Sequence, residues 1–178
     1  MAAKGSGKMK VTLPSDTEIL LSREFDAPAH LVFEAATKPE YVKRWWPAMP
    51  GYTMPLCEID LRVGGKWRYV MIGKDGNEVA FNGVYREIVP NKKLVHTEIF
   101  EPFPQAETVV TVTFESRGDK TFLTALQQCG SKETRDAIIE SGMEVGAGLS
   151  YDALEQVAQS LVPAGGTAGT GRTGARAV

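Results

Sequence analysis

The chain has 178 residues, 43 % of them hydrophobic and 24 % charged, with a formal net charge of −2 at pH 7. This is the ordinary composition of one globular domain, and the absence of a Lys/Arg stripe interleaved with aromatics argues against a nucleic-acid partner. No segment is apolar enough to span a membrane, and the amino end lacks the hydrophobic block of a secretory signal. We therefore expect a cytoplasmic protein without membrane insertion.

Both ends of the chain are predicted to be tails. Residues 1–16 mix Gly, Ser, Lys and Pro, and we expect a flexible segment there. Residues 162–178 are a Gly/Ala/Thr run that cannot bury enough surface to offset its ordering entropy, so we expect disorder. An alternative is that Arg172 and Arg176 of this tail contact a partner. A single domain is predicted between the tails, over residues 17–161.

The domain begins with an expected strand at residues 18–25, followed by a short helix. Asp26 is a candidate N-cap, and Pro28 suits the first turn, where its missing N–H costs nothing. Pro39 ends this helix because it pushes the residue before it out of helical geometry.

A second short helix is predicted over residues 40–46 and ends at Pro47 in a Trp-Trp-Pro corner. Each indole can bury a large area but needs an acceptor for its N–H. The two tryptophans can both be core anchors, or one of them, Trp46, can line a ligand cavity.

The middle of the chain alternates polar and apolar residues between turn signals, as antiparallel strands do. Gly64-Gly65 marks a tight turn or bulge, and residues 74–77 (Lys-Asp-Gly-Asn) a hairpin turn. With the first strand, the expected strands make one antiparallel sheet; the further segments are residues 56–62, 66–72, 78–89, 94–100, 108–115 and 121–128.

Alternation also sorts side chains by face. If the aromatic face of the sheet points inward, Arg68 and Arg86 point outward. The inward set would then include Trp67, Tyr69, Met71, Phe81, Tyr85 and Phe114.

One strand is ambiguous, because His96 and Glu98 share a face with Leu94 and Phe100. If this pair faces a cavity, burial would raise the pKa of the carboxyl and suit it to general acid or base catalysis. Because no third group that would orient the pair is visible in the sequence, we expect a solvated pair on the outer face of the sheet instead.

A C-terminal helix is predicted from Glu133 to Leu161, with Ser131 as its N-cap. Gly146 and Gly148 lie inside it at a cost of about 1 kcal/mol each relative to alanine, which indicates close packing or a cavity wall. Its apolar stripe begins at Met143 and faces the sheet.

The two cysteines, Cys57 and Cys129, lie far apart in strand-like surroundings. We expect both to be reduced and buried; a disulfide or a reactive thiol is the alternative. With only two histidines, His30 and His96, no spaced ligand set for a metal is present, and we expect neither metal nor cofactor.

Three motifs in this order resemble a known family. They are F-D-A-P-(x)4-F-(x)5-P-(x)5-W-W-P from residue 25, D-L-R-V-G-G-K-W-R-Y from residue 60, and G-V-Y-R-E-I-V-P-N-K-K-L-V-H-T from residue 83. The chain is similar to the AHSA family, homologues of the C-terminal domain of the activator of heat-shock chaperone ATPase, within the SRPBCC (START-like) superfamily. The resemblance covers about residues 17–161.

The resemblance implies an α+β helix-grip fold: a bent antiparallel sheet of six to seven strands around a long C-terminal helix, with two short helices after the first strand. Such folds usually hold a cavity between sheet and helix. The family usually carries a Gly-Trp pair where this chain has Gly146-Ala147. The missing indole would enlarge the cavity, unless another side chain such as Trp67 fills the space.

Three classes of function are compatible with this reading. The first is binding of a small hydrophobic or amphipathic molecule such as a lipid. The second is a cyclase-like or hydratase-like enzyme using His96 or Glu98. The third, implied by the family name, is a stress-response protein that partners a heat-shock chaperone; a second copy of the chain is another possible partner. We favour the first, with a site formed by Trp46, Trp67, Tyr69, Met71, Phe81, Tyr85, Phe114, Met143 and Ala147.

Overall fold

The computed structural model describes residues 7–163. The expectations for residues 1–6 and 164–178, including the contacts of Arg172 and Arg176, lie outside the described residues.

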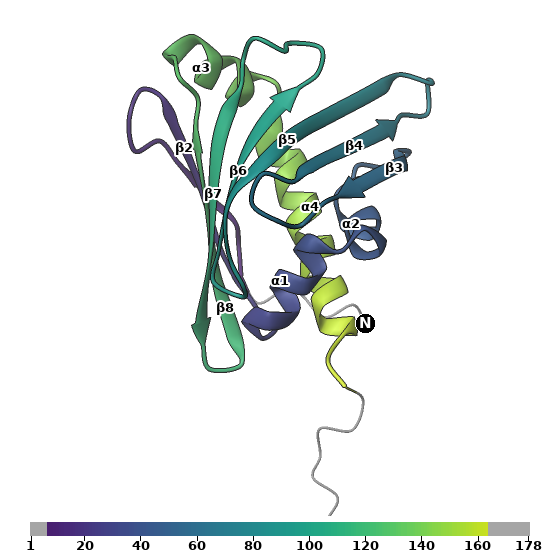
Figure 1. Ribbon diagram of the computed structural model, residues 1–178, viewed down its shortest axis with the longest axis vertical. Coiled ribbons are helices and arrows are strands. Elements are labelled where there is room, and N and C mark those ends of the chain that lie inside the picture. Colours follow the sequence, from purple (N-terminus) through teal and green to yellow (C-terminus); the bar gives the residue numbers. More distant parts are fainter. Residues whose placement is uncertain (1–6, 164–178) are drawn as a thin grey trace, which may run out of the picture.

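The described chain forms one antiparallel sheet flanked by helices (Figure 1), which confirms the α+β helix-grip class. The strand order is β1-β2-β8-β7-β6-β5-β4-β3, so consecutive strands from β3 to β8 are neighbours. β2 pairs with β8, and β1 forms the edge beyond β2. The strands are β1 (Lys10–Thr12), β2 (Glu18–Phe25), β3 (Thr53–Ile59), β4 (Lys66–Ile72), β5 (Glu78–Val89), β6 (Lys93–Phe100), β7 (Thr108–Arg117) and β8 (Lys120–Gln128).

The sheet has eight strands rather than six or seven, because part of the expected N-terminal tail is a strand. Lys10–Thr12 pair with Leu20–Ser22 of β2 as an edge strand. Val11 packs against the core, and burying this one apolar side chain helps to order a segment that composition alone marks as flexible.

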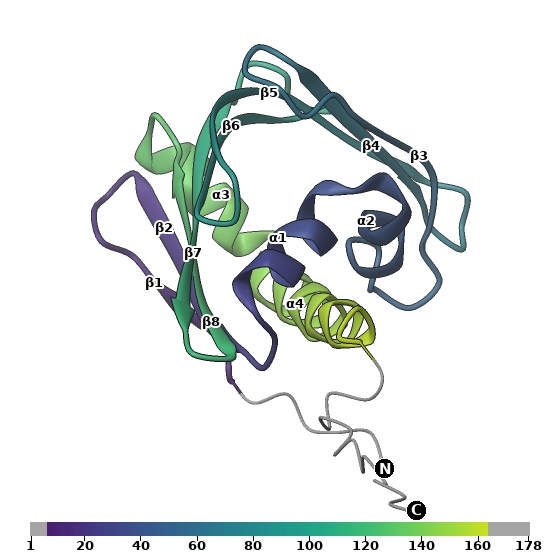
Figure 2. The same cartoon turned by 60° about the horizontal axis from the view of Figure 1, so that its bottom comes forward.

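The sheet is strongly bent, and Figure 2 shows β5 and β6 at the bend with the helices on the concave side. The β5–β6 register shifts between Tyr85 and Glu87, and the backbone N–H of Val84 donates to Thr97 Oγ1 at 2.9 Å instead of to a strand carbonyl. An irregularity of this kind bends a strand pair and increases its twist.

Two short helices, α1 (Ala29–Thr37) and α2 (Pro39–Trp45), follow β2 as expected. The N-cap of α1 is Pro28 and makes no side-chain capping bond, so the expected cap by Asp26 is wrong. The backbone N–H of Asp26 instead donates to Glu155 at 2.9 Å, and this ties the chain before α1 to the C-terminal helix.

The predicted C-terminal helix is broken in two, α3 (Lys132–Glu140) and α4 (Met143–Ser160). Ser131 caps α3 as expected, since its Oγ accepts from the backbone N–H of Thr134 at 3.1 Å. The break falls at Gly142, whose φ of 82° is a left-handed conformation that favours glycine.

Helix α4 crosses the open side of the sheet and contacts both α1 and α2 (Figure 2). A buried ion pair fixes it to β2: the Arg23 guanidinium contacts Glu155 at 3.4 Å and Asp152 at 2.6 Å. Both cysteines are buried and free. No helix within residues 7–163 is long and apolar enough to cross a membrane.

Candidate ligand-binding cavity

A cavity of about 910 Å³ lies between the concave face of the sheet and helices α3 and α4. Its walls come from every strand from β4 to β8, from Leu21 of β2, and from the Trp-Trp-Pro corner after α2. Pockets that hold drug-sized ligands have about 300–1,000 Å³ and mostly apolar walls with a few polar groups, and this cavity matches that description.

The structure places all nine sequence-predicted site residues on this one cavity. Three strands of the sheet supply the aromatic wall, and helix α4 supplies Met143 and Ala147. The sheet residues on the wall are Trp67, Tyr69, Met71, Phe81, Tyr85 and Phe114, and Trp46 joins them from the corner after α2.

The two adjacent tryptophans have different roles. Trp45 is buried, and its Nε1–H donates to the carbonyl of Ala35 at 2.8 Å, as a core anchor requires. Trp46 is half-buried on the cavity wall, where its ring meets Tyr69 and Phe81 edge-on at centroid distances of 5.0 and 5.9 Å. Ser150 of α4 donates to the Trp46 carbonyl at 2.9 Å and holds this corner against the helix.

Helix α4 presents small side chains to the cavity, namely Gly146, Ala147 and Ser150. A Cβ added at Gly146 would meet no heavy atom within 4 Å. Trp67 lies on the facing sheet wall against Tyr69 and His96, at centroid distances of 4.7 and 5.4 Å. Trp67 of the sheet and Ala147 of the helix therefore line the same cavity.

Trp67 packs over a glycine of the neighbouring strand. Its register partner is Gly83, where an added Cβ would lie 2.5 Å from the indole nitrogen and 1.9 Å from the Thr97 carbonyl oxygen. Only glycine allows this close approach. The indole Nε1–H is buried without a hydrogen-bond partner, so the ring is held by packing alone.

His96 and Glu98 of β6 both line the cavity, so the expectation of a solvated pair on the outer face is wrong. Both side chains are half-buried, and the surface that they keep accessible faces the cavity. Leu94 and Phe100 line the cavity as well, so this whole alternating face of β6 points toward the interior. Arg68 and Arg86 do lie outside, where they pair with Glu101 and Glu107.

The two polar groups differ in their surroundings. Nδ1 of His96 lies 3.1 Å from the Thr97 carbonyl oxygen, and burial lowers the pKa of the ring, so we assign the neutral form with Nδ1–H donating. Burial raises the pKa of Glu98 to about 7. No side chain within residues 7–163 forms a hydrogen bond or ion pair with the Glu98 carboxyl, which leaves its oxygens facing the cavity.

Three tyrosines complete the polar part of the wall. Burial raises the pKa of Tyr69, Tyr85 and Tyr151, so all three hydroxyls stay protonated at neutral pH. After burial, the charge of Glu98 is a further cause that raises the pKa of Tyr69 and of Tyr151.

The sequence analysis missed part of the cavity wall. Tyr151 lines the cavity and follows Ala147 by four residues on α4, so helical spacing was a signal that could have identified it. Gln127 and Thr108 make a polar stretch of wall, with Gln127 Nε2 donating to Thr108 Oγ1 at 3.0 Å. Phe103 and Met49 lie in loops at the cavity margin and are 58 and 42 % exposed, and no periodic pattern indicated either.

A second hollow and a metal site are the other possibilities, and the described residues give both little support. A hollow of about 690 Å³ beside Pro28 and His30 is lined largely by exposed residues of loops and strand ends. Among residues 7–163, no three or more His, Cys, Asp or Glu side chains are arranged to hold a metal ion.

Comparison with known proteins agrees with this fold. The family described as "Activator of Hsp90 ATPase homolog 1-like protein" matches residues 26–159. A search of curated proteins found no match.

Several solved structures are similar to the chain over most of its length. A Rhodobacter sphaeroides protein has a TM-score of 0.81 at 25 % identity, covering 86 % of this chain and 99 % of its own. A Nitrosomonas europaea protein has a TM-score of 0.75 at 25 % identity, covering 83 and 97 %. An AHSA1-like protein from Aeromonas hydrophila shares the fold, with a TM-score of 0.61 at 19 % identity over 79 and 92 %. The chain belongs to the AHSA family of helix-grip proteins.

Proposed function

We propose that the protein binds a small hydrophobic or amphipathic molecule in the cavity between the sheet and α4. The observation that carries the proposal is a space of about 910 Å³ walled by aromatic side chains and by small residues of α4, with polar groups on β6. An apolar body packed on the aromatic wall would gain about 25 cal/mol for each Å² that it removes from water. The polar groups would fix its orientation.

The test uses two tryptophan substitutions on the same helix. Ala147→Trp places an indole in the cavity, and Val145→Trp places one at a position that is 66 % exposed and outside the cavity wall. Binding is followed with Nile red, a neutral dye whose fluorescence rises in apolar surroundings. We expect saturable binding by the wild type and by the Val145 variant, and at least about tenfold weaker binding by the Ala147 variant.

Two results would contradict the proposal. One is that Nile red shows no saturable binding and no lipid or aromatic compound displaces it. The other is that both tryptophan variants bind the dye as the wild type does, because the dye would then occupy another surface.

A second candidate is an enzyme of the cyclase or hydratase kind, favoured by Glu98 and His96 on the cavity wall. A carboxyl with a pKa of about 7 is suited to proton transfer at neutral pH. The test is turnover of cyclisable or hydratable aromatic substrates. A rate profile that changes near pH 7, and loses this change in Glu98→Gln, would support catalysis; equal turnover by the variant would exclude Glu98 as the acid or base.

A further inference from the structure

The charges along the cavity are of one sign. The residues that line it include two acids, Glu98 and Glu133, and no lysine or arginine. His96 is the remaining basic side chain of the wall, and burial keeps it neutral. A ligand carboxylate would therefore meet no cation on the wall, and it would meet the like charge of Glu98.

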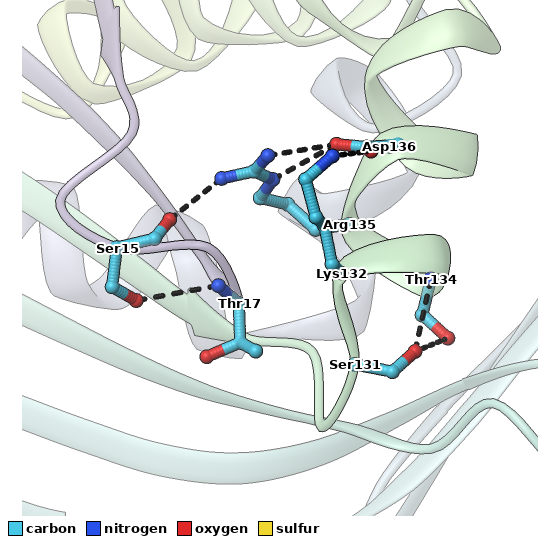
Figure 3. Close-up of polar contacts among 7 residues, drawn as sticks. All are labelled: Ser15, Thr17, Ser131, Lys132, Thr134, Arg135 and Asp136. Atoms are coloured by element: carbon cyan, nitrogen blue, oxygen red, sulfur yellow. Dashed lines mark hydrogen bonds and ion pairs between the residues drawn. The ribbon is translucent and has the colours of Figure 1, made fainter.

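The nearby arginines are engaged elsewhere. Arg135 follows two cavity residues, Glu133 and Thr134, on α3, but Figure 3 shows it turned toward Ser15 and Asp136. Its Nη1 donates to the Ser15 carbonyl at 2.7 Å, and its Nη2 donates to Asp136 at 2.8 Å. Arg23 is held by Asp152 and Glu155. Neither arginine lines the cavity.

The carboxyl of Glu98 is an acid of this wall that no described cation balances. An ionised carboxylate away from bulk water is costly unless a cation or several hydrogen-bond donors compensate it. No described side chain supplies either by direct contact, and the hydroxyls of Tyr69 and Tyr151 lie only within its electrostatic reach. A cation brought by the ligand would supply the missing partner.

Aromatic rings on the same part of the wall suit a cation as well. Trp67 and Tyr85 contact His96 at centroid distances of 5.4 and 6.1 Å, Tyr69 packs on Trp67, and His96 lies two residues from Glu98 on the same face of β6. Aromatic faces attract ammonium groups, and more strongly where the site is desolvated. Tyrosine oxygens add hydrogen-bond acceptors for an N–H donor.

We propose that the cavity selects amphipathic amines, whose ammonium group pairs with Glu98 while the apolar body lies on the aromatic wall. The inference rests on the proposed binding function and names its ligand class. It predicts that primary amines bind more tightly than alcohols of the same body, and that carboxylates bind most weakly.

The test is displacement of Nile red from the full-length protein by matched head-group series. One series is dodecylamine, 1-dodecanol and dodecanoate, used below their aggregation limits; the other is tryptamine, tryptophol and indole-3-propionate. At pH 8 we expect the amine of at least one series to bind about tenfold or more tightly than its alcohol. In Glu98→Gln this preference should be lost, while the affinity for the alcohol changes little.

A matched control separates Glu98 from general surface charge. Glu58→Gln removes an exposed acid of β3 that does not line the cavity and should leave the amine preference intact. Glu133→Gln, at the α3 side of the cavity, measures the contribution of the other acid of the wall.

The amine preference should also increase between pH 6 and pH 8, as Glu98 ionises. The titratable groups that share the cavity with Glu98 include His96 on the same strand, Tyr69 on β4, Tyr85 on β5, Tyr151 on α4 and Glu133 on α3. Cys129, which follows β8, also interacts electrostatically with Glu98. Burial lowers the pKa of His96 and raises the pKa of each of these tyrosines and of Cys129, so none of them acquires charge as the pH rises over this range. The Glu133→Gln variant tests whether the charge of Glu133 contributes to the pH dependence of the amine preference.

The outcomes separate the two proposals. If Nile red does not bind and no compound of either series binds, the binding function fails and the amine selectivity fails with it. If the dye binds but alcohols or carboxylates compete as well as amines, amine selectivity alone is overturned. Retention of the amine preference in Glu98→Gln would overturn it as well.

Discussion

Replacing Glu98 by glutamine should stabilise the protein at pH 8 and leave its stability almost unchanged near pH 4. Burial raises the pKa of this carboxyl from 4.5 to about 7. The folded protein therefore holds the proton more tightly than the unfolded chain does between these two values. The stability associated with the protonated group is fully present below about pH 4.5 and is lost as the pH rises through about 7.

The size of the effect follows from the same two pKa values. The pKa values of Glu98 in the folded and unfolded protein differ by about 2.5, and each whole step in pKa corresponds to about 1.36 kcal/mol. Ionisation of Glu98 above pH 7 therefore lowers the free energy of unfolding by about 3 kcal/mol. Because part of the carboxyl surface remains accessible to water, we expect about 2 kcal/mol to be measurable. Glutamine has nearly the same shape and no charge, so it removes this pH dependence.

The assay is urea unfolding of the wild type, Glu98→Gln and Glu58→Gln at intervals between pH 4 and pH 8. The stability gained by the Glu98 variant should grow from about zero at pH 4 to about 2 kcal/mol at pH 8. The exposed Glu58 variant should follow the wild type. Parallel profiles for the wild type and the Glu98 variant, or a Glu98 variant that is less stable at pH 8, would refute the burial of an unpaired carboxyl.

Three further predictions concern the framework around the cavity. Gly83→Ala should destabilise the protein by about 1–3 kcal/mol in urea unfolding, because the added Cβ would lie 1.9 Å from a carbonyl oxygen. Gly146→Ala has open space around the added Cβ and should stabilise the protein by about 0.5–1 kcal/mol. Equal effects of the two substitutions would contradict the packing described. Arg135→Met should lower the free energy of unfolding by about 1–3 kcal/mol and speed amide hydrogen exchange in α3, because it removes the hydrogen bond to the Ser15 carbonyl. Lys132→Met, at an exposed position of the same helix, should change both quantities little. Similar exchange rates in the two variants would contradict the anchoring of α3 by Arg135. Burial raises the pKa of Cys57 to about 11, so iodoacetamide at pH 8 should label it far more slowly in the folded protein than in urea; equal rates would contradict its burial.

Most of the sheet could be predicted from the chain because its hairpins carry clear local signals. The Lys-Asp-Gly-Asn turn separates two long alternating runs, and the bounds expected for both, residues 66–72 and 78–89, are those of β4 and β5. Once the strands are placed, alternation selects the inward face, and the aromatic residues of that face line the cavity. Their position on the wall needed no information beyond local pattern.

The break in the C-terminal helix could not be predicted, because the region contains three glycines that look alike in sequence. Gly146 and Gly148 continue the helix, and Gly142 ends one helix and begins another with a φ of 82°. Of the three, only Gly142 takes the left-handed conformation, and the local sequence does not distinguish it from the others. The hydrogen bond from Arg135 of α3 to the Ser15 carbonyl joins residues 120 positions apart, so no local window contains it either.

The faces of β6 were ambiguous for a related reason. Each face carries apolar residues, so alternation did not show which side holds His96 and Glu98. The structure turns the face with His96 and Glu98 inward, where Leu94 and Phe100 line the cavity beside them. A carboxyl turned inward is contrary to the usual preference of acidic residues for solvent, and such exceptions occur most often at functional sites.

The small residues of α4 and the inward carboxyl of β6 are physically connected. An unpaired carboxyl inside a filled core would be held in its neutral form and could offer a ligand no charge. Gly146 and Ala147 line the same cavity as Glu98, and a Cβ added at Gly146 would meet no heavy atom within 4 Å, so this part of the interior is not filled by the helix. Under the proposed amine selectivity, the affinity of this cavity for an amine should therefore increase as the pH rises through about 7 and Glu98 ionises.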